Sequence, residues 1–306
     1  MNFATGFRQS NRSWSPFTAE RQRGWALVSV LWTVALLAIL AAALQGLMVA
    51  SWRLESRAMR AAVAEAALDA AINRAVVGIS DPLMERRWRV DGVPEHFAFG
   101  GADIRVVVQD DRGLIDLNTA DESLIRQLLK NAGLTDEKAS ALVDKILDWR
   151  SETGLRRMHG ASDADYRAQG YPYHQRHGPF RTVDELKLVM DMTPALFDKI
   201  VPALTVHSKS AAPDPMFAPR EVLLALNNND GKFVNALLDR RLHERIVSDD
   251  LPTTVPPGIV DPTTPLDGRS YVVAAHVTLE GRMFARQATV EFTGNPKQPI
   301  FFLDWQ

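Results

Sequence analysis

A stretch without charged side chains, residues 25–52, constrains the fold of this chain more than any other feature. It contains no Asp, Glu, Lys or Arg, and residues 24–50 are mainly Ala, Leu and Val. About 20 such residues cross the hydrocarbon core of a bilayer as a helix. We therefore predict a transmembrane helix over residues 25–50.

The residues that follow indicate what kind of segment this is. A cleavable secretory signal has an apolar core of only about 7 to 15 residues, followed by a cut site. Here residues 53–77 continue without Gly or Pro and are rich in the strong helix formers Ala, Arg and Glu. One helix is predicted over residues 25–78, apolar all round in its first half and amphipathic in its second. The same architecture is compatible with a signal anchor that holds a soluble domain at a membrane.

Residues 1–24 form a basic leader. The first 23 of them hold four Arg and one Glu, and the positive-inside rule would keep such a segment in the cytoplasm. Because Arg53, Arg57 and Arg60 lie just beyond the other end of the apolar stretch, charge alone leaves the orientation open.

Short strands are predicted on both sides of a long helical region. Runs of β-branched and aromatic residues bounded by Gly-containing turns are typical of hairpins. The expected strands are residues 87–90, 95–99, 102–109, 271–279, 283–292 and 300–305, with turns at 91–92, 100–101 and 280–281. We expect one antiparallel sheet in two parts, residues 79–113 and 249–306, the second part beginning with a proline-rich linker over 249–268.

Residues 114–248 are predicted to form an inserted α-helical domain. Apolar residues recur with helical spacing in three related segments, 115–150, 182–206 and 218–241, which indicate hairpins of helices with turns at 132–134 and 191–192. The expected helix caps are Asn118 or Thr119, then Thr135, Thr182 and Thr193. The predicted fold class is α+β: a long N-terminal helix packed on a small antiparallel sheet, with a large helix-hairpin-helix-like insertion.

These hairpins resemble the tandem helix-hairpin-helix modules of competence-type DNA receptors, notably in IDLNTADESL and GPFRTVDELKLV. Such modules use a Gly-x-Gly hairpin whose amides bind a phosphate. Here Gly133 is followed by Thr135 where the second Gly is expected, and the second hairpin places Asp191 at the phosphate position. Residues 117–206 hold 13 acidic and 12 basic side chains, whereas DNA binding requires a basic excess. A membrane-anchored DNA receptor remains an alternative, but nucleic acid is not the expected partner.

The sequence contains no recognisable catalytic motif. It has no Walker lysine, no HExxH and no GxSxG, and its lack of cysteine excludes disulfides and thiolate metal sites. We therefore predict that the protein is not an enzyme. An anchored enzyme is the remaining alternative, because catalytic triads are spatial rather than sequential.

The junction between leader and apolar stretch carries a more specific signal. Gly24, then Trp25, then ALVSVLW resemble the signal of type IV pilins and type II secretion pseudopilins. This resemblance implies that prepilin peptidase cleaves between Gly24 and Trp25 on the cytoplasmic side. Most of the family has Glu at the position of Ser29, where it is thought to pair with the amine of the subunit ahead. A subunit that has no other subunit ahead of it in the fibre would not need that Glu. The serine therefore favours a position at the tip of a fibre.

The whole chain resembles the minor pseudopilin K family of the type II secretion system. The resemblance is carried by GLIDLNTA at 113–120, LVDKILDW at 142–149, DADYRAQGYPYH at 163–174 and GPFRTVDELKLV at 178–189. It implies a protein that caps or initiates the pseudopilus tip for protein export across the outer membrane. The implied partners are the minor pseudopilins I and J, with H as a further candidate, the major pseudopilin and prepilin peptidase. The implied location is the inner membrane, crossed once, with the globular part in the periplasm; a minor pilin of type IV pili is an alternative.

The loop over residues 151–179 holds the candidates for a metal site. Asp163 and Asp165 alternate as ligands of hard cations can, and the family resemblance implies calcium as a candidate ion. Relatives often have further acidic residues after the Trp, where this chain has Arg150, Ser151 and Glu152, so part of such a site is missing. A helix cap is the alternative role for Asp163. His174 and His177 could approach one metal, but no third ligand is evident from the sequence.

Overall fold

The computed structural model describes residues 22–83, 86–243 and 266–305. Residues 1–21 of the predicted leader and residues 249–265 of the predicted linker lie outside the described residues. The chain divides into two compact units, Met1–Ala62 and Val63–Gln306.

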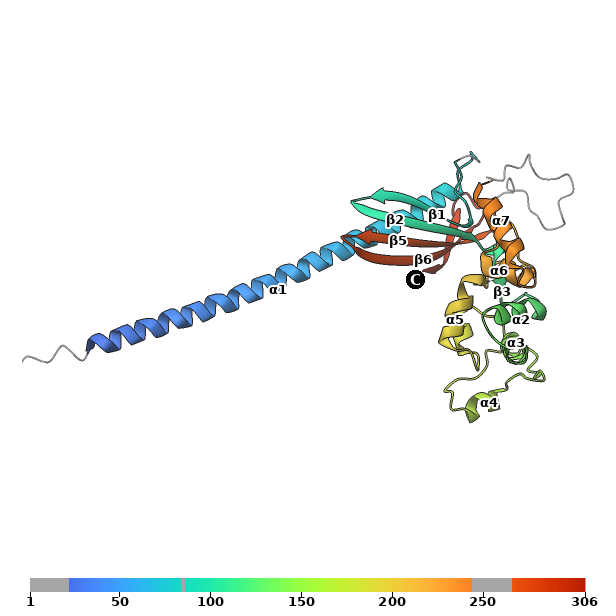
Figure 1. Cartoon of the computed structure of the whole chain (residues 1–306), viewed down its shortest axis with the longest axis horizontal. Coiled ribbons are helices and arrows are strands. Elements are labelled where there is room, and N and C mark those ends of the chain that lie inside the picture. Colours follow the sequence, from blue (N-terminus) through green and yellow to red (C-terminus); the bar gives the residue numbers. More distant parts are fainter. Residues whose placement is uncertain (1–21, 84–85, 244–265, 306) are drawn as a thin grey trace, which may run out of the picture. The chain divides into compact units, whose positions relative to one another are not determined.

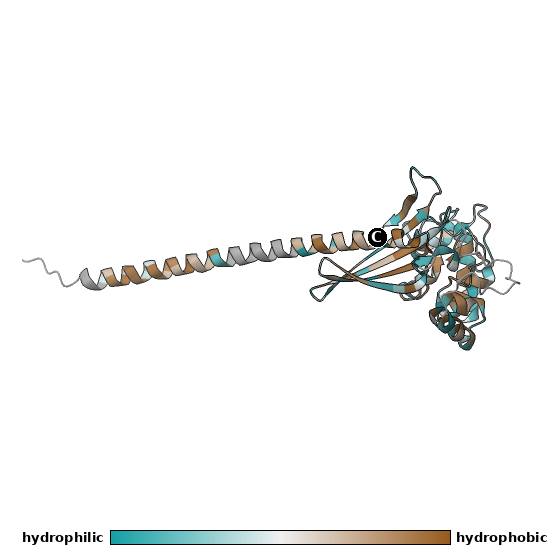
Figure 2. Cartoon of the chain, turned by 90° about the horizontal axis from the view of Figure 1, so that it is seen from above, coloured by the Kyte–Doolittle hydropathy of each residue, from teal (hydrophilic) through white to brown (hydrophobic). Residues whose placement is uncertain are grey.

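The predicted long helix is confirmed as α1, Gln22–Ile79, which is continuous over 58 residues. Within it Trp25–Gln45 is long and apolar enough to cross a membrane, with a mean hydropathy of 2.6 and no part buried by the protein. Figure 2 shows this stretch largely in the brown of apolar residues. An apolar surface of this length without a covering requires a partner of similar polarity, which a bilayer or other apolar helices provide.

The second unit contains a five-stranded antiparallel sheet with the order β1-β2-β5-β6-β7. Its strands are β1 (Asp91–Phe99), β2 (Ala102–Asp110), β5 (Ser270–Leu279), β6 (Arg282–Phe292) and β7 (Ile300–Trp305). Strand β2 pairs directly with β5, from Asp103 opposite Thr278 to Asp110 opposite Tyr271. The helical region lies between β2 and β5 in the chain and is therefore an insertion into the sheet, as expected (Figure 1).

The sheet and the last turns of α1 enclose one hydrophobic core. Alternate residues of β2 are buried, as the period of a strand that is covered on one face requires. Figure 1 shows the end of α1 running beside these strands. The largest core side chains from the helix and from β2 and β5 are Leu68, Ile72, Ile79, Ile104, Val106, Val108, Tyr271, Val273 and Val277.

The predicted strand at residues 87–90 is wrong. These residues form a bend and irregular backbone, and the strand β1 begins at Asp91, where a turn was expected. Gly92 has a φ of 84°, and the register slips between Asp91 and Pro94. Such a bulge uses glycine at positive φ and accommodates an edge-strand proline, which has no N–H to donate. Trp88 instead packs on α1: a Cβ on Gly78 would lie 2.5 Å from its ring.

The insertion forms a second core. Its helices are α2 (Glu122–Asn131), α3 (Asp136–Arg150), α4 (Asp163–Ala168), α5 (Pro194–Ile200), α6 (Arg220–Leu226) and α7 (Gly231–His243), with 3-10 helices at Asp111–Gly113, Val183–Leu188 and Val201–Ala203. Two short strands, β3 (Ile115–Asp116) and β4 (Leu204–Thr205), pair in parallel. This pairing brings the beginning of the first helical hairpin next to the end of the second. The core includes Ile125, Leu129, Ile146, Trp149, Tyr166, Leu186 and Ile200.

Two of the expected helix caps are confirmed with a side-chain hydrogen bond, Thr182 is confirmed only in its position, and the cap expected at Asn118 or Thr119 is wrong. The side chains of Thr135 and Thr193 accept hydrogen bonds from backbone amides in the first turns of α3 and α5. Asp121, not Asn118 or Thr119, occupies the cap position of α2. Thr182 precedes a 3-10 helix and makes no side-chain cap bond. Asn118 is used for a tertiary contact instead, because its amide pairs with both backbone groups of Phe180.

Candidate assembly and metal sites

The first candidate site is the apolar part of α1. Trp25 is 83% exposed, and Ser29, at the position where the family usually has Glu, places its hydroxyl 2.9 Å from the carbonyl oxygen of Ala26. The hydroxyl of Thr33 donates in the same way to Val30 at 2.8 Å. Both polar groups are therefore satisfied within the helix itself, so neither requires a partner inside a membrane. Gly24 and Trp25 lie in the first turn of α1, which begins at Gln22.

The second feature is the connection between sheet and insertion. Asp110 ends β2 with a fully buried carboxylate, and the guanidinium of Arg112 donates to it from Nη2 at 2.7 Å and from Nε at 3.0 Å. The same guanidinium lies 4.7 Å from the centre of the Phe217 ring. The backbone carbonyl of Arg112 accepts a hydrogen bond of 2.7 Å from the amide of Asp214. A paired buried charge with this many contacts fixes where the inserted domain begins.

Asp111, the neighbour of this pair, is buried, and neither of its carboxylate oxygens has a hydrogen-bond partner among the described residues. Burial raises its pKa from 3.8 to about 7, against the opposing influence of the nearby Ser270 and Thr205 hydroxyls. The negative charges of Asp110 and Asp116 raise it further. At neutral pH this carboxyl group is therefore close to its own titration midpoint.

The hairpin turns do not form phosphate sites. Gly133 in the first turn has a φ of 109°, and Thr135 is used as the cap of α3. In the second turn Asp191 has a φ of 68° and forms an ion pair with Lys145. A carboxylate at this position repels a phosphate, and its pairing occupies a lysine that could have bound one. The geometry gives no support to the DNA-receptor alternative.

Of the two predicted metal ligands, Asp165 has a structural role. It forms a capping box with Ser162 at the start of α4, accepting hydrogen bonds of 2.7 Å from both the amide and the hydroxyl of that serine. Arg156 lies 3.4 Å away as a third partner. All three groups contact Oδ2 of Asp165, so this carboxylate serves in the structure as a helix cap and an ion-pair partner.

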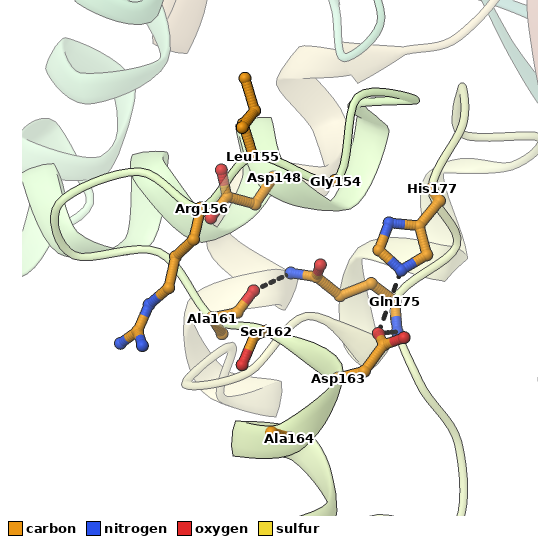
Figure 3. Close-up of a pocket in the computed structure, with 10 residues that line it drawn as sticks. All are labelled: Asp148, Gly154, Leu155, Arg156, Ala161, Ser162, Asp163, Ala164, Gln175 and His177. Atoms are coloured by element: carbon orange, nitrogen blue, oxygen red, sulfur yellow. Dashed lines mark hydrogen bonds and ion pairs between the residues drawn. The ribbon is translucent and has the colours of Figure 1, made fainter.

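Asp163, in contrast, is not the cap but lies beside two histidines. The Nε2 atom of His177 is 3.1 Å from Asp163 Oδ1, which also accepts a hydrogen bond of 3.1 Å from the amide of Gln175 (Figure 3). His174 completes the group: one donor atom from each residue lies within 4.8 Å of the others. The hydrogen bonds from His177 and Gln175 outweigh the effect of burial and lower the pKa of Asp163. Asp163 is therefore a third potential donor beside the two histidines, a grouping that the sequence did not reveal.

These residues do not fit calcium. Calcium takes six to eight oxygen ligands, and nitrogen donors suit it poorly. The group at Asp163 offers one carboxylate and two imidazoles. Asp148, buried nearby, is occupied by the amide of Arg157, 3.2 Å from each of its oxygens, and lies against Gly160, where a Cβ would approach to 1.7 Å. The calcium expectation therefore has no matching donor set in the described part of this loop.

Aromatic packing holds the loop around this group in place. Trp149 lies at the end of α3. The centre of its ring is 6.0 Å from the ring centre of Tyr166, 6.5 Å from that of Tyr173 and 6.3 Å from that of Phe180. The hydroxyl of Tyr166 accepts a hydrogen bond of 2.9 Å from the amide of Met190. The run DADYRAQGYPYH is thus a structural element: its tyrosines pack, and its polar residues remain at the surface.

Together, the apolar N-terminal helix, its packing on an antiparallel sheet and the insertion between β2 and β5 define a pilin-like protein with an inserted helical domain. Residues 104–209 match the family model described as "Type II secretion system (T2SS), protein K". The resemblance to the K minor pseudopilins is confirmed by this match, whereas the DNA-receptor alternative is not favoured.

Two relatives carry the name type II secretion system protein K. The protein of Klebsiella pneumoniae is 26% identical over 204 residues, which cover 60% of this chain and 62% of the relative, slightly less than two thirds of its length. The protein of Pseudomonas aeruginosa PAO1 is 25% identical over 252 residues, which cover 75% of each chain.

A solved structure shares the fold. It is that of a GspK–GspI–GspJ complex from the type 2 secretion system of enterotoxigenic Escherichia coli, and the matched chain superposes with a TM-score of 0.52 at 14% identity. The match covers 84% of this chain and 97% of that one.

Proposed function

We propose that this chain is the K minor pseudopilin of a type II secretion system and that it caps or initiates the tip of the pseudopilus. The observation that carries the proposal is the insertion of a helical domain between β2 and β5 of a pilin-like sheet; the first part of this insertion, as far as β4, lies within residues 104–209, which match the protein K family model. This architecture supports a role in assembly rather than catalysis. The protein would contribute binding surfaces, not a reaction centre.

In this proposal the precursor is held in the inner membrane by Trp25–Gln45, with its globular part in the periplasm. Prepilin peptidase would cleave between Gly24 and Trp25 and leave the apolar helix on the mature protein. The helix would then leave the bilayer laterally for a bundle of sibling helices. Small residues such as Ala35, Ala38 and Ala42 would allow the close approach that such packing requires.

Position at the tip is supported by Ser29. A carboxylate at this place is costly in an apolar bundle unless a neighbouring amine pairs with it. The serine hydroxyl of this chain is satisfied by its own helix, so no subunit needs to lie ahead of it. A bulky insertion on each subunit would also obstruct repeated stacking along a fibre, whereas one copy at the end would not.

The proposed partners are the minor pseudopilins I and J, with which the structurally similar GspK was crystallised. The minor pseudopilin H and the major pseudopilin would follow below in the fibre. Co-expression of the full chain with its own I and J counterparts, extracted in mild detergent, tests this proposal. We expect a stable ternary complex on size-exclusion chromatography, and a chain that stays alone when all three are present would contradict it.

Processing is tested separately by N-terminal sequencing of the protein purified from membranes. The mature chain should begin at Trp25. An intact Met1, or a new terminus beyond residue 50, would contradict the proposal and favour a signal anchor or a secreted protein.

A further inference from the structure

Three side chains that are separate in the sequence converge at the surface of the insertion. Asp163 is the first residue of α4, whereas His174 and His177 belong to the loop that follows. Their donor atoms lie within 4.8 Å of one another. We propose that Asp163, His174 and His177 form a binding site for a divalent transition metal of the zinc class. This site does not depend on the assembly role proposed above.

The donor set selects the class of metal. Two imidazole nitrogens and one carboxylate oxygen are a common three-ligand set for zinc, which completes its tetrahedron with water or a donor from another molecule. Bonds of about 2.0–2.1 Å place tetrahedral donors roughly 3.4 Å apart. The distance between Asp163 Oδ1 and His177 Nε2 is already 3.1 Å. All three donor atoms already lie within 4.8 Å of one another, so changes of side-chain torsions bring them to this spacing as the metal replaces the proton between His177 Nε2 and Asp163 Oδ1.

Gln175 supplies the second shell of this site. Its backbone carbonyl lies 2.6 Å from His174 Nδ1, so that Nδ1 carries the proton and the lone pair of Nε2 is free for a metal. Its backbone amide donates to Asp163 at 3.1 Å. Its side chain is 97% buried and donates to the carbonyl of Ala161. One anchored residue therefore orients two of the three ligands, as the outer shells of metal sites do.

The backbone at His177 also favours a functional role for this residue. Its φ is 54°, a left-handed conformation that is uncommon outside glycine and is found preferentially at functional sites. The amide of the next residue, Gly178, donates to the carbonyl of Trp149 and so fixes the loop to the end of α3. Asp163 and His177 border a cavity of about 260 Å³, which leaves room for a water molecule at the fourth metal position (Figure 3).

The experiment is a zinc titration of the full-length protein in detergent, prepared without a polyhistidine tag. A chromophoric chelator that competes for the metal reports the affinity. We expect one zinc ion per chain and no displacement by excess calcium. The variants His174→Gln and His177→Asn should each weaken zinc binding at least about tenfold. Asparagine is chosen at position 177 because it tolerates positive φ.

The matched control is His159→Gln, which changes an exposed histidine of the same loop outside the cluster. It should bind zinc as the unchanged protein does. The proposal is overturned if zinc binding does not saturate, if both ligand variants retain full affinity, or if the control variant loses as much as they do.

A second measurement needs no variant. X-ray absorption at the zinc edge of the loaded protein should show two imidazole ligands and otherwise oxygen. A shell with one imidazole or none would overturn the proposal, even if the variants proved too unstable to compare.

Discussion

The carboxylate of Asp110 and the guanidinium of Arg112 form a buried pair at the point where the sheet ends and the insertion begins. Arg112 Nη2 lies 2.7 Å from Asp110 Oδ2, and the aspartate side chain is completely inaccessible to solvent. Burial disfavours the charged guanidinium, but its hydrogen bonds to Asp110 prevail and raise the pKa of Arg112. The two elements that distinguish this protein, sheet and insertion, therefore meet at a charge that is stable only when it is paired.

Removal of the Arg112 side chain should destabilise the folded protein. We expect Arg112→Ala to lower the free energy of unfolding by about 3–5 kcal/mol, because it leaves the charge of Asp110 buried and unpaired. Lys130→Ala is the control: the side chains of Lys130 and its partner Asp136 are 39% and 69% exposed, so the loss should stay below about 1 kcal/mol. Urea denaturation followed by circular dichroism measures both. Equal losses would show that burial of the pair is not what matters.

The titration of Asp111 predicts a pH dependence of stability. Because its pKa is raised to about 7, the folded chain holds a proton that the unfolded chain releases near the ordinary value of 3.8. The free energy of unfolding should therefore fall as the pH rises between these two values. Above about pH 7 it should stay at this lower level, because Asp111 is then charged in both the folded and the unfolded chain.

Asp111→Asn removes this titration. Relative to the unchanged protein, the variant should gain on the order of 2 kcal/mol between about pH 5 and about pH 8. The comparison uses urea unfolding of both proteins at the two pH values, so that the other titrating groups cancel. A difference between the proteins that does not change with pH would contradict the raised pKa.

Gly113 should not tolerate a side chain. A Cβ at this position would lie 2.4 Å from the carbonyl carbon of Phe217, and backbone atoms cannot move aside as a flexible side chain can. We expect Gly113→Ala to destabilise the protein by roughly 1–3 kcal/mol. Gly231→Ala is the matched control, because a Cβ there meets no atom of the described part of the chain within 4 Å. Thermal unfolding monitored for both variants should show a clear loss only for the first.

Processing should depend on the residue before the proposed cut. Gly24→Leu is expected to leave the leader on the chain in cells that contain prepilin peptidase, because a bulky side chain would occupy the place of a glycine at the scissile bond. Intact-mass measurement distinguishes the two forms. Gly6→Leu, in the leader but away from the junction, should be processed normally. Normal cleavage of the Gly24 variant would show that this junction is not the processing site.

The elements with strong local signals were predictable from the sequence. The helix α1 has neither Gly nor Pro between residues 53 and 77, and the turn at Gly100-Gly101 has the positive φ values that only glycine adopts easily. The start of β1 was not predictable in this way. Residues 87–90 have strand-like composition, but Trp88 packs over Gly78 and Pro94 places a bulge near the strand's beginning, and both effects depend on distant contacts.

The sequence by itself determined the apolar helix, the strands on either side of a helical region and the family resemblance, because each depends on residues that are near one another in the chain. Only the tertiary structure decided which polar side chains meet. Asp165 caps its own helix through Ser162, while Asp163 meets two histidines more than ten residues away. Side chains of the same type therefore received different roles, because the hydrogen bonds and packing of the folded loop, rather than sequence spacing, fix where each carboxylate points.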